Sequence, residues 1–513
     1  MSVQSGEDLA GLGKPVRCVV VIVGIYLVLA VLFAVCTPAW QNPDEPAHYN
    51  YVKYLAEQYH FPVLKPGDYQ AAYLEEIKAA RFPPEMSIDP IRYEFHQPPL
   101  YYLLAAAVYR VFDGALLPLR LMTAAIGAML LVVVYWTVQA VAPRQPGLAL
   151  AATAFVAWMP MHVAQSAAAG NDLLAELVLA TIVLLAIRYL KIPPAGADGR
   201  PPLQATVQAV VVMGIATGLA FVTKSGIYVA LPLALVAIAA RHLWLEGQPF
   251  SGRAFARAVG LYLLPAVALA LPWWVRNVAQ YGGLDLLGLE RHNLVVAGQL
   301  RTAEFLAANG AARWLGDLGL TTFRSFWGQF GWMGVLIDER LYQALAVWSA
   351  VALAGLAAWA VGIWQQARNG WRPARWQAAA GGLLALLTLF SVASYLWYNT
   401  QFVQFQGRYL FTALVPISLA AAVGWREALR HERAWLLVTL LIGGATVVAV
   451  GSILAGDLAQ WPVLMLGASG VAFAVRRFLP RRWDPLVEAL PYLVLIPLDL
   501  ACLFLFIVPQ LAR

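Results

Sequence analysis

Apolar runs of about bilayer-spanning length recur from one end of the chain to the other, and they constrain the fold more than any other feature. A helix needs about 20 mostly apolar residues to cross the hydrocarbon core. The core offers the backbone no hydrogen bonds, so spanning segments are helices or closed barrels. Strands of a barrel would alternate apolar and polar residues, whereas these runs are nearly continuous. We therefore predict an all-α, polytopic membrane helical bundle of about 13 transmembrane helices, near residues 16–37, 118–141, 149–168, 173–190, 206–222, 226–241, 257–275, 343–366, 377–397, 408–425, 434–454, 461–478 and 487–508.

The composition excludes a soluble globule. Of 513 residues, 61% are hydrophobic and 12% are charged, whereas soluble domains carry about 25% charged residues. The net charge of +7 fits basic residues on cytoplasmic loops, and we predict no nucleic-acid partner. The 3 cysteines lie in or near apolar runs and imply no disulfide framework.

Basic residues indicate the topology. They cluster within 188–200, 241–257, 368–375, 426–433 and 476–482, and these clusters alternate with loops poor in Lys and Arg. Lys14 and Arg17 precede the first run. The positive-inside rule then predicts a cytoplasmic N-terminus and an outer C-terminus, in the cytoplasmic (inner) membrane.

One apolar segment, residues 99–112, is short for a crossing. If it crossed, every later basic cluster would face outward, so we predict an interfacial helix there. Two long extracytoplasmic loops result, at 38–117 and 276–342, and long loops are usually functional. We divide the chain into a catalytic transmembrane module, residues 1–230, and a C-terminal transmembrane module, residues 231–513.

Two adjacent carboxylates, Asp44 and Glu45, follow the first run between Pro43 and Pro46. The prolines restrict the backbone and fix where the carboxylates point. A carboxylate at a membrane face can act as a general base if its proton target is within reach. The alternative is structural, because Asp44 or Asn42 could cap a following helix.

Further polar residues fall on the same predicted side. His96 closes the first outer loop, and a lone histidine there is more often a hydrogen-bonding residue than a catalyst. Asn171 and Asp172 lie between two spans, where Asp172 either faces the same side as Asp44 or caps the next helix.

Three cations also lie at outer ends of spans: Lys224, Arg276 and Arg408. Basic side chains at that depth suit a lipid-linked phosphate, and the alternative partners are lipid headgroups or local carboxylates. Two carboxylate sites and three cations on one face, beside loops rich in Trp and Tyr, fit an anionic lipid donor that meets an acceptor at the outer surface.

The order of these motifs resembles the GT-C superfamily of integral membrane glycosyltransferases, which includes protein O-mannosyltransferases and lipid A aminoarabinose transferases. The resemblance covers roughly the first 230 residues, and its motifs are Asp44-Glu45, His96-Gln97-Pro98-Pro99-Leu100, Arg120-Leu121 and Asn171-Asp172. Later segments are similar to a less characterised branch of multi-span proteins, at 272–277, 326–332 and 406–410.

The resemblance implies an inverting transfer of a hexosyl or pentosyl group from a polyprenyl-phosphate donor to a protein, lipid or glycan acceptor at the extracytoplasmic face. Asp44 is then the general base, Glu45 its neighbour, and Asp172 orients substrate. Gln97 stands where relatives often have Lys, so phosphate binding would shift to Lys224, Arg276 or Arg408. The full substrate-binding set adds His48, His96, Asn171 and Tyr409. No cofactor is required, and a divalent cation could bind at Asp44 and Glu45.

Two other functions stay open. One is a glycan polymerase or ligase that uses a lipid-diphosphate donor and also needs outer basic residues. The other is a transporter or flippase, which would place ionisable residues in mid-span. In this chain they gather at the outer ends of spans, which favours the transferase.

Overall fold

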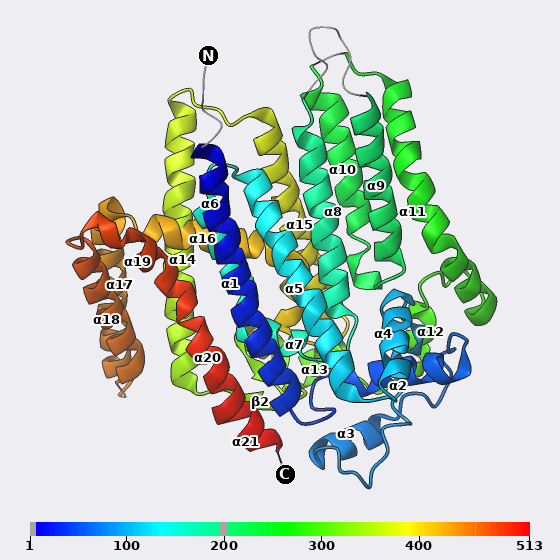
Figure 1. Cartoon of the computed structure of the whole chain (residues 1–513). Coiled ribbons are helices and arrows are strands. Elements are labelled where there is room, and N and C mark those ends of the chain that lie inside the picture. Colours follow the sequence, from blue (N-terminus) through cyan, green and yellow to red (C-terminus); the bar gives the residue numbers. More distant parts are fainter. Residues whose placement is uncertain (1–6, 194–202, 248, 457, 513) are drawn as a thin grey trace.

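The structure, a computed structural model, describes residues 7–193, 203–247, 249–456 and 458–512. It is almost entirely helical (Figure 1). Within the described residues, 11 helices are long and apolar enough to cross a membrane, or up to 12 if one bent pair counts as a span. The predicted all-α, polytopic membrane bundle is therefore confirmed as a fold class.

Long helices run side by side through the bundle, from the start of α1 at the top of Figure 1 to the end of α21 at the bottom. Apolar side chains from most of them form one continuous core. The main helices are α1 (Glu7–Cys36), α5 (Leu116–Val141), α8 (Asp172–Lys191), α9 (Leu203–Phe221), α10 (Ala230–Ala240), α11 (Gly252–Tyr281), α14 (Glu339–Arg368), α15 (Arg375–Asn399), α16 (Leu414–Ala428), α17 (Ala434–Leu454), α18 (Gln460–Arg476), α19 (Asp484–Leu493), α20 (Leu495–Ala501) and α21 (Val508–Leu511). Short turns extend or join them: η2 (Ser225–Ile227), η3 (Arg241–Leu245), η4 (Gly407–Ala413), η5 (His431–Arg433), η6 (Arg481–Trp483) and η7 (Cys502–Ile507).

The predicted count of about 13 spans is not confirmed, and two segments account for the difference. The run at 149–168 is two helices, α6 (Pro146–Ala157) and α7 (Pro160–Ser166), bent by 65°. Pro160 lacks an N–H and disfavours helical geometry in the residue before it, so the helix breaks there. The run at 461–478 contains α18, which has only 17 residues.

Small residues let helices of the bundle approach closely. A side chain at Gly355 of α14 would collide with the backbone of Gly424 in α16, and one at Gly424 would collide with Ala352. Small residues that bring backbones together are the usual packing device within membranes, where the hydrophobic effect between helices is weak. Helices of the two predicted modules pack on one another, α6 against α16 and α8 against α15, and the division at residue 230 stays a prediction.

The first outer loop contains α2 (Glu45–Gln58), α3 (Ala71–Ala79), η1 (Tyr93–His96) and α4 (Leu100–Val111). These elements gather at the lower end of the bundle (Figure 1). Helix α4 has 12 residues, which is about 18 Å at the helical rise. That length is well short of a hydrocarbon core of about 30 Å, as expected for the short segment at 99–112.

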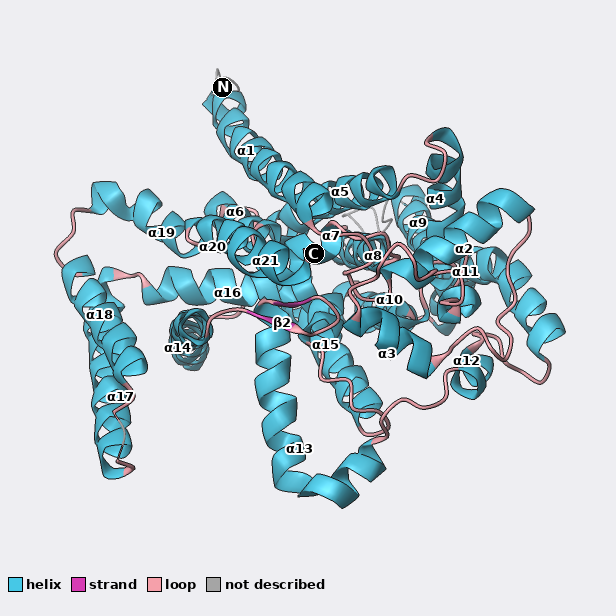
Figure 2. Cartoon of the chain, turned by 90° about the horizontal axis from the view of Figure 1, so that it is seen from below, coloured by secondary structure: helices cyan, strands magenta, loops and turns pink. Residues whose placement is uncertain are grey.

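The second outer loop is far more structured than a connecting loop. It contains α12 (Leu289–Val295), α13 (Thr302–Trp327) and a small antiparallel hairpin of β1 (Gln329–Phe330) and β2 (Val335–Leu336). Helix α13 lies at the edge of the molecule and is interrupted by non-helical backbone at Gly310 (Figure 2). These elements were not expected from the sequence, because they lack the continuous apolar runs that mark spans.

Candidate functional site

Asp44 projects its carboxylate into a pair of strong contacts instead of capping the helix that follows it. It occupies the position before α2 with a left-handed backbone, φ 67°, and makes no capping hydrogen bond. Its Oδ2 accepts a bond of 2.7 Å from Arg408 Nη2, and its Oδ1 accepts one of 2.8 Å from the Tyr93 hydroxyl. A non-glycine residue in this conformation is strained, and such strain is concentrated at functional sites.

The electrostatic surroundings of Asp44 keep it ionised. Burial alone would raise the pKa of this carboxyl, but Arg408 and His48 outweigh it and hold the pKa below its usual value. The hydrogen bonds from Arg408 and Tyr93 act in the same direction. Burial, together with the charge of Asp44, raises the pKa of the Tyr93 phenol well above its usual value, so its hydroxyl remains a donor.

Glu45, although adjacent to Asp44, points elsewhere. Its side chain is 0% exposed and accepts hydrogen bonds of 2.8 and 2.6 Å from Arg120. The backbone N–H groups of Trp40 and Ala169 also donate to it. Arg120 in turn donates to the carbonyl oxygens of Ala34, Thr37 and Pro38. Glu45 is thus enclosed and fully occupied by hydrogen bonds, unlike Asp44, and its predicted catalytic role stays a prediction.

The second predicted acidic residue, Asp172, forms an ion pair with Lys224. It opens α8, while Asn171 before it makes no capping bond and instead donates to Gln97 Oε1 at 3.3 Å. Lys224 and Arg408 have few acidic neighbours in sequence, yet each pairs with a carboxylate that is distant in sequence. Local spacing carries no information about such contacts.

A small cavity of about 30 Å³ lies among these residues, roughly enough for one water. Asp172, Arg408 and His48 line it, together with Asn42 and Pro43 beside Asp44. Its remaining walls come from the bent segment, the start of α8 and the β1 hairpin: Met161, Ala164, Gln165, Ala168, Ala169, Gly170, Leu173, Phe330 and Gly331. Residues predicted from four separate segments thus meet at one place.

Two predicted histidines differ in what they contact. His48 lines the cavity, and its Nδ1 lies 2.7 Å from the Tyr102 hydroxyl. His96 is buried, with Nδ1 3.1 Å from the Tyr93 carbonyl and its ring 4.5 Å from that of His292. Burial and the nearby His292 hold the pKa of His96 well below its usual value, so it is neutral near pH 7.

The position of Arg408 is set by the second outer loop. Ser325 Oγ of α13 accepts a 2.7 Å bond from the Gly407 N–H and donates to the Phe405 carbonyl. A side chain at Gly407 would collide with the backbone of Thr322 and Phe326. Only glycine therefore lets η4 lie directly on α13 and deliver Arg408 to Asp44.

Arg276 and Tyr409 have other surroundings. Arg276 donates to the Pro62 carbonyl and to Asn277 Oδ1, and it stacks 4.6 Å from the Trp273 ring. It therefore fastens α11 to the first outer loop. The Tyr409 ring lies 5.6 Å from the Arg408 guanidinium and 5.9 Å from the Tyr398 ring, beside the site.

No cluster of three or more His, Cys, Asp or Glu side chains suited to a metal ion occurs in the described residues. The two carboxylates predicted to share a divalent cation diverge, Asp44 toward Arg408 and Glu45 toward Arg120. As a pair they do not fit that role.

Sequence reasoning assigned no role to four contributors. Tyr93 and Arg120 are two of them, and their partners are 49 and 75 residues away. The other two, His162 and Glu176, are buried 3.2 Å apart, and Glu176 lies one helical turn beyond Asp172. A signal existed for Glu176, because it follows Asp172 by four residues and so lies on the same helix face.

Comparisons with solved structures identify the fold. The apo form of ArnT from Cupriavidus metallidurans superposes with a TM-score of 0.52 and 14% identity, over 96% of this chain and 77% of ArnT. The same protein bound to undecaprenyl phosphate superposes with a TM-score of 0.50 and 15% identity, with the same coverage of both chains. An oligosaccharyltransferase from Archaeoglobus fulgidus, tethered to an acceptor peptide, superposes with a TM-score of 0.47 and 13% identity, over 92% of this chain and 55% of the other.

The chain thus shares the fold of ArnT over most of both chains. Neither family models nor curated protein sequences match this chain.

Proposed function

We propose that this protein is an inverting glycosyltransferase that uses a polyprenyl-phosphate sugar donor at the extracytoplasmic face of the cytoplasmic membrane. The observation that carries the proposal is the meeting of Asp44 with Arg408 at 2.7 Å, across 364 residues of chain. This contact adjoins a cavity that is also lined by Asp172, the partner of Lys224. Transfer from a lipid phosphate requires a base for the acceptor and cations for the phosphate, and this cavity has a base and two cations beside it.

The reaction that fits this arrangement is a single displacement. The acceptor hydroxyl or amine attacks the anomeric carbon, and its proton passes to the Asp44 carboxylate. The bond between the anomeric carbon and the phosphate oxygen breaks, and its electron pair leaves with the polyprenyl phosphate. Arg408 and Lys224 stabilise the charge that develops on that oxygen. Attack opposite to the leaving group inverts the anomeric configuration.

Arg408 can bind the Asp44 carboxylate and the donor phosphate at the same time. Its guanidinium has five N–H donors in a planar fork. The hydrogen bonds to Asp44 and to Gln406 Oε1 use two of them. The remaining donors suit a phosphate oxygen, so the residue can orient the base while it holds the leaving group.

The ligand bound to ArnT supports the class of donor. That structure holds undecaprenyl phosphate, and the folds agree over most of both chains. The acceptor remains a protein, lipid or glycan, and the sugar a hexosyl or pentosyl group, within this proposal.

The test is direct binding of undecaprenyl phosphate to the purified protein in nanodiscs, followed by native mass spectrometry. We expect Arg408→Ala and Lys224→Ala to weaken binding about 10-fold, since a hydrogen bond to a charged group contributes about 1.5–3 kcal/mol. The control is Arg313→Ala, because Arg313 pairs with Asp317 on the exposed part of α13. Equal binding by all three variants would refute the proposal. Much tighter binding of undecaprenyl diphosphate would favour the polymerase or ligase instead.

A further inference from the structure

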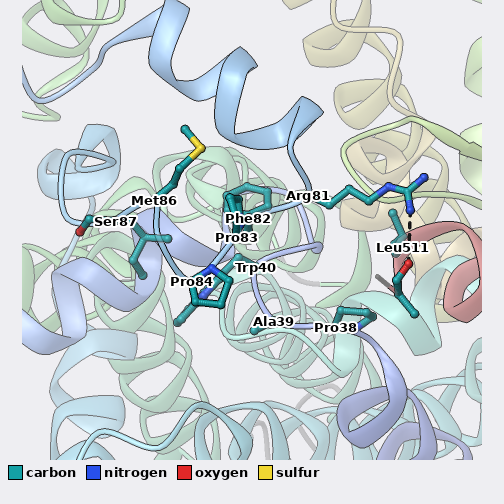
Figure 3. A pocket seen from close by; sticks show the side chains of 12 residues that line it. Pro38, Ala39, Trp40, Arg81, Phe82, Pro83, Pro84, Met86, Ser87 and Leu511 are labelled. Carbon is teal, nitrogen blue, oxygen red and sulfur yellow. Dashed lines mark hydrogen bonds between the residues drawn. The ribbon is translucent and has the colours of Figure 1, made fainter.

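A second cavity, separate from the one beside Asp44, has a volume of about 710 Å³. Figure 3 shows the side chains that line it. Three segments line it: Pro38–Trp40 before Asp44, residues 81–84 and 86–88 of the first outer loop, and Leu511 with Ala512 at the end of the last helix. A pocket of this size is in the range that encloses a small ligand or one part of a larger one.

The lining is mostly apolar, with Trp40, Phe82, Met86 and Leu511 among the side chains that face the space. Leu511 also ends the final apolar span, which runs from Arg481 to Leu511. The pocket therefore lies where that span reaches the interface. A molecule that resides in the membrane can enter it laterally.

The turn of the β1–β2 hairpin forms a layer that adjoins both cavities: Gly331 lines the small cavity, and a side chain there would collide with Leu511 of the large pocket. Next to it, Trp332 donates a 2.9 Å hydrogen bond to the Trp40 carbonyl and stacks on Phe82, with ring centroids 5.9 Å apart.

The layer is strained in a way that suits a movable wall. Trp332 and Met333 have φ values of 54° and 69°, and Trp40, Arg81 and Phe82 across the pocket have 67°, 59° and 52°. Non-glycine residues rarely adopt positive φ, and they gather at active sites and ligand clamps when they do. Three of these five residues, Trp40, Arg81 and Phe82, line the pocket, which indicates a functional surface.

The pocket is also close to the proposed base. Asp44 follows Trp40 by four positions, and a chain spans at most about 14 Å over that distance. The Trp40 N–H donates a hydrogen bond to the Glu45 carboxylate, which holds residues 38–40 beside the site. One lining residue of the pocket therefore lies within about 14 Å of the proposed base, measured along the backbone.

We propose that this pocket binds the apolar part of a membrane-borne, lipid-linked acceptor, and that Trp332 is the partition between it and the catalytic cavity. The role as acceptor site rests on the proposed transferase function. The partition and the lipid ligand do not depend on turnover, so they are tested without it.

The first test measures connection of the two cavities by cysteine labelling. Ala168→Cys places a thiol in the small cavity, in a background where Cys18 and Cys36 are replaced by serine and the buried Cys502 is kept. We expect Trp332→Ala to speed its reaction with a methanethiosulfonate reagent at least 10-fold. Trp435→Ala, on the exposed face of α17, is the matched control.

A second substitution tells whether the reagent enters through the large pocket. Ala39→Trp fills the pocket and should abolish the acceleration caused by Trp332→Ala, whereas Glu85→Trp adds the same bulk to the same loop outside the lining and should not. A labelling rate within twofold of the parent in Trp332→Ala, or an acceleration that survives Ala39→Trp, would overturn the partition.

The ligand class is tested with a diazirine-bearing phosphatidylethanolamine in nanodiscs. After illumination, we expect mass spectrometry to find adducts on residues 81–88, reduced at least 5-fold by Ala39→Trp and unchanged by Glu85→Trp. Adducts confined to the membrane-spanning helices would overturn the assignment of a lipid ligand. If undecaprenyl phosphate fails to bind while these results hold, the transferase proposal fails and the lipid pocket stands.

Discussion

Asp44 and Glu45 are neighbours in sequence, yet the regions into which they point have opposite properties. The Glu45–Arg120 pair is enclosed, with side chains 0% and 4% exposed, and backbone groups complete its hydrogen bonds. The Asp44–Arg408 pair is more open, and the Asp44 side chain is 29% exposed on a strained backbone. The comparison indicates that access and unused bonding capacity, more than charge, separate the carboxylate that we propose as the base from the one that anchors the fold.

The largest effect should come from breaking the enclosed pair. Arg120→Met leaves Glu45 as a buried charge without its partner, and such losses cost about 3–5 kcal/mol of unfolding free energy. Denaturant unfolding in detergent measures it. Because the cost comes from the orphaned charge, adding Glu45→Gln should recover part of the loss. A change below about 1 kcal/mol would show that the pair does not anchor the fold.

The open pair should respond mainly in activity, and less in stability than the enclosed pair. Asp44→Asn keeps the shape of the side chain but removes the base, so we expect transfer to fall about 100-fold or more. The level of folded protein in the membrane should stay near that of the wild type. Transfer is measured with a radiolabelled polyprenyl-phosphate sugar. Wild-type turnover by Asp44→Asn, together with an inactive but folded Glu45→Gln, would reverse the two assignments.

A smaller effect should separate charge from geometry within the open pair. Arg408→Lys keeps the charge but loses the planar fork, so it cannot hold Asp44 and a phosphate oxygen together. We expect the donor KM to rise about 10-fold, on the scale of one charge-assisted hydrogen bond. Lys224 binds as a point charge, so Lys224→Arg, which keeps the positive charge, should change the donor KM less. An unaltered KM in Arg408→Lys would mean that the phosphate lies elsewhere.

The smallest effect is in pH dependence. The pKa of Asp44 is lowered in the folded protein, so its ionised form persists in mild acid. Its contribution to stability is present above the unfolded value of about 3.9 and is lost as pH falls through the lower folded pKa. Transfer should therefore keep its base from about pH 5 upward. Arg408→Gln removes a main cause of the lowering and should move the acid limb of the pH–rate profile to higher pH, and an unmoved limb would exclude Arg408 as that cause.

The sequence was sufficient for the fold class and for the convergence of several polar residues. Apolar runs mark spans directly, and the topology that they imply placed Asp44, Asp172, Lys224 and Arg408 on one face. In the structure these residues do adjoin one cavity, although their chemical roles remain predictions. The sequence did not indicate which carboxylate forms an ion pair with which arginine. Nothing in the spacing of Asp44 and Glu45 indicates that one meets Arg408 and the other Arg120.

The structure of the outer loops could not be predicted from the sequence either. Helix α13 and the β1–β2 hairpin have no long apolar run, and their form depends on contacts with distant segments such as residues 405–408 and Trp40. Span-based reasoning therefore described the part of the protein that lipid surrounds. It gave no structure to the part where the proposed chemistry occurs.

The direct packing of Gly407 on α13 has a consequence for how the chain can be divided or recombined. Because this packing brings Arg408 to Asp44, the proposed catalytic unit is assembled from both halves of the chain, and we expect neither half to be active alone. Fragments 1–230 and 231–513 expressed alone should be silent, whereas their co-expression should restore transfer by complementation. A chimera that grafts the first half onto another member of this fold would also have to import the α13 and η4 segments as a single cassette.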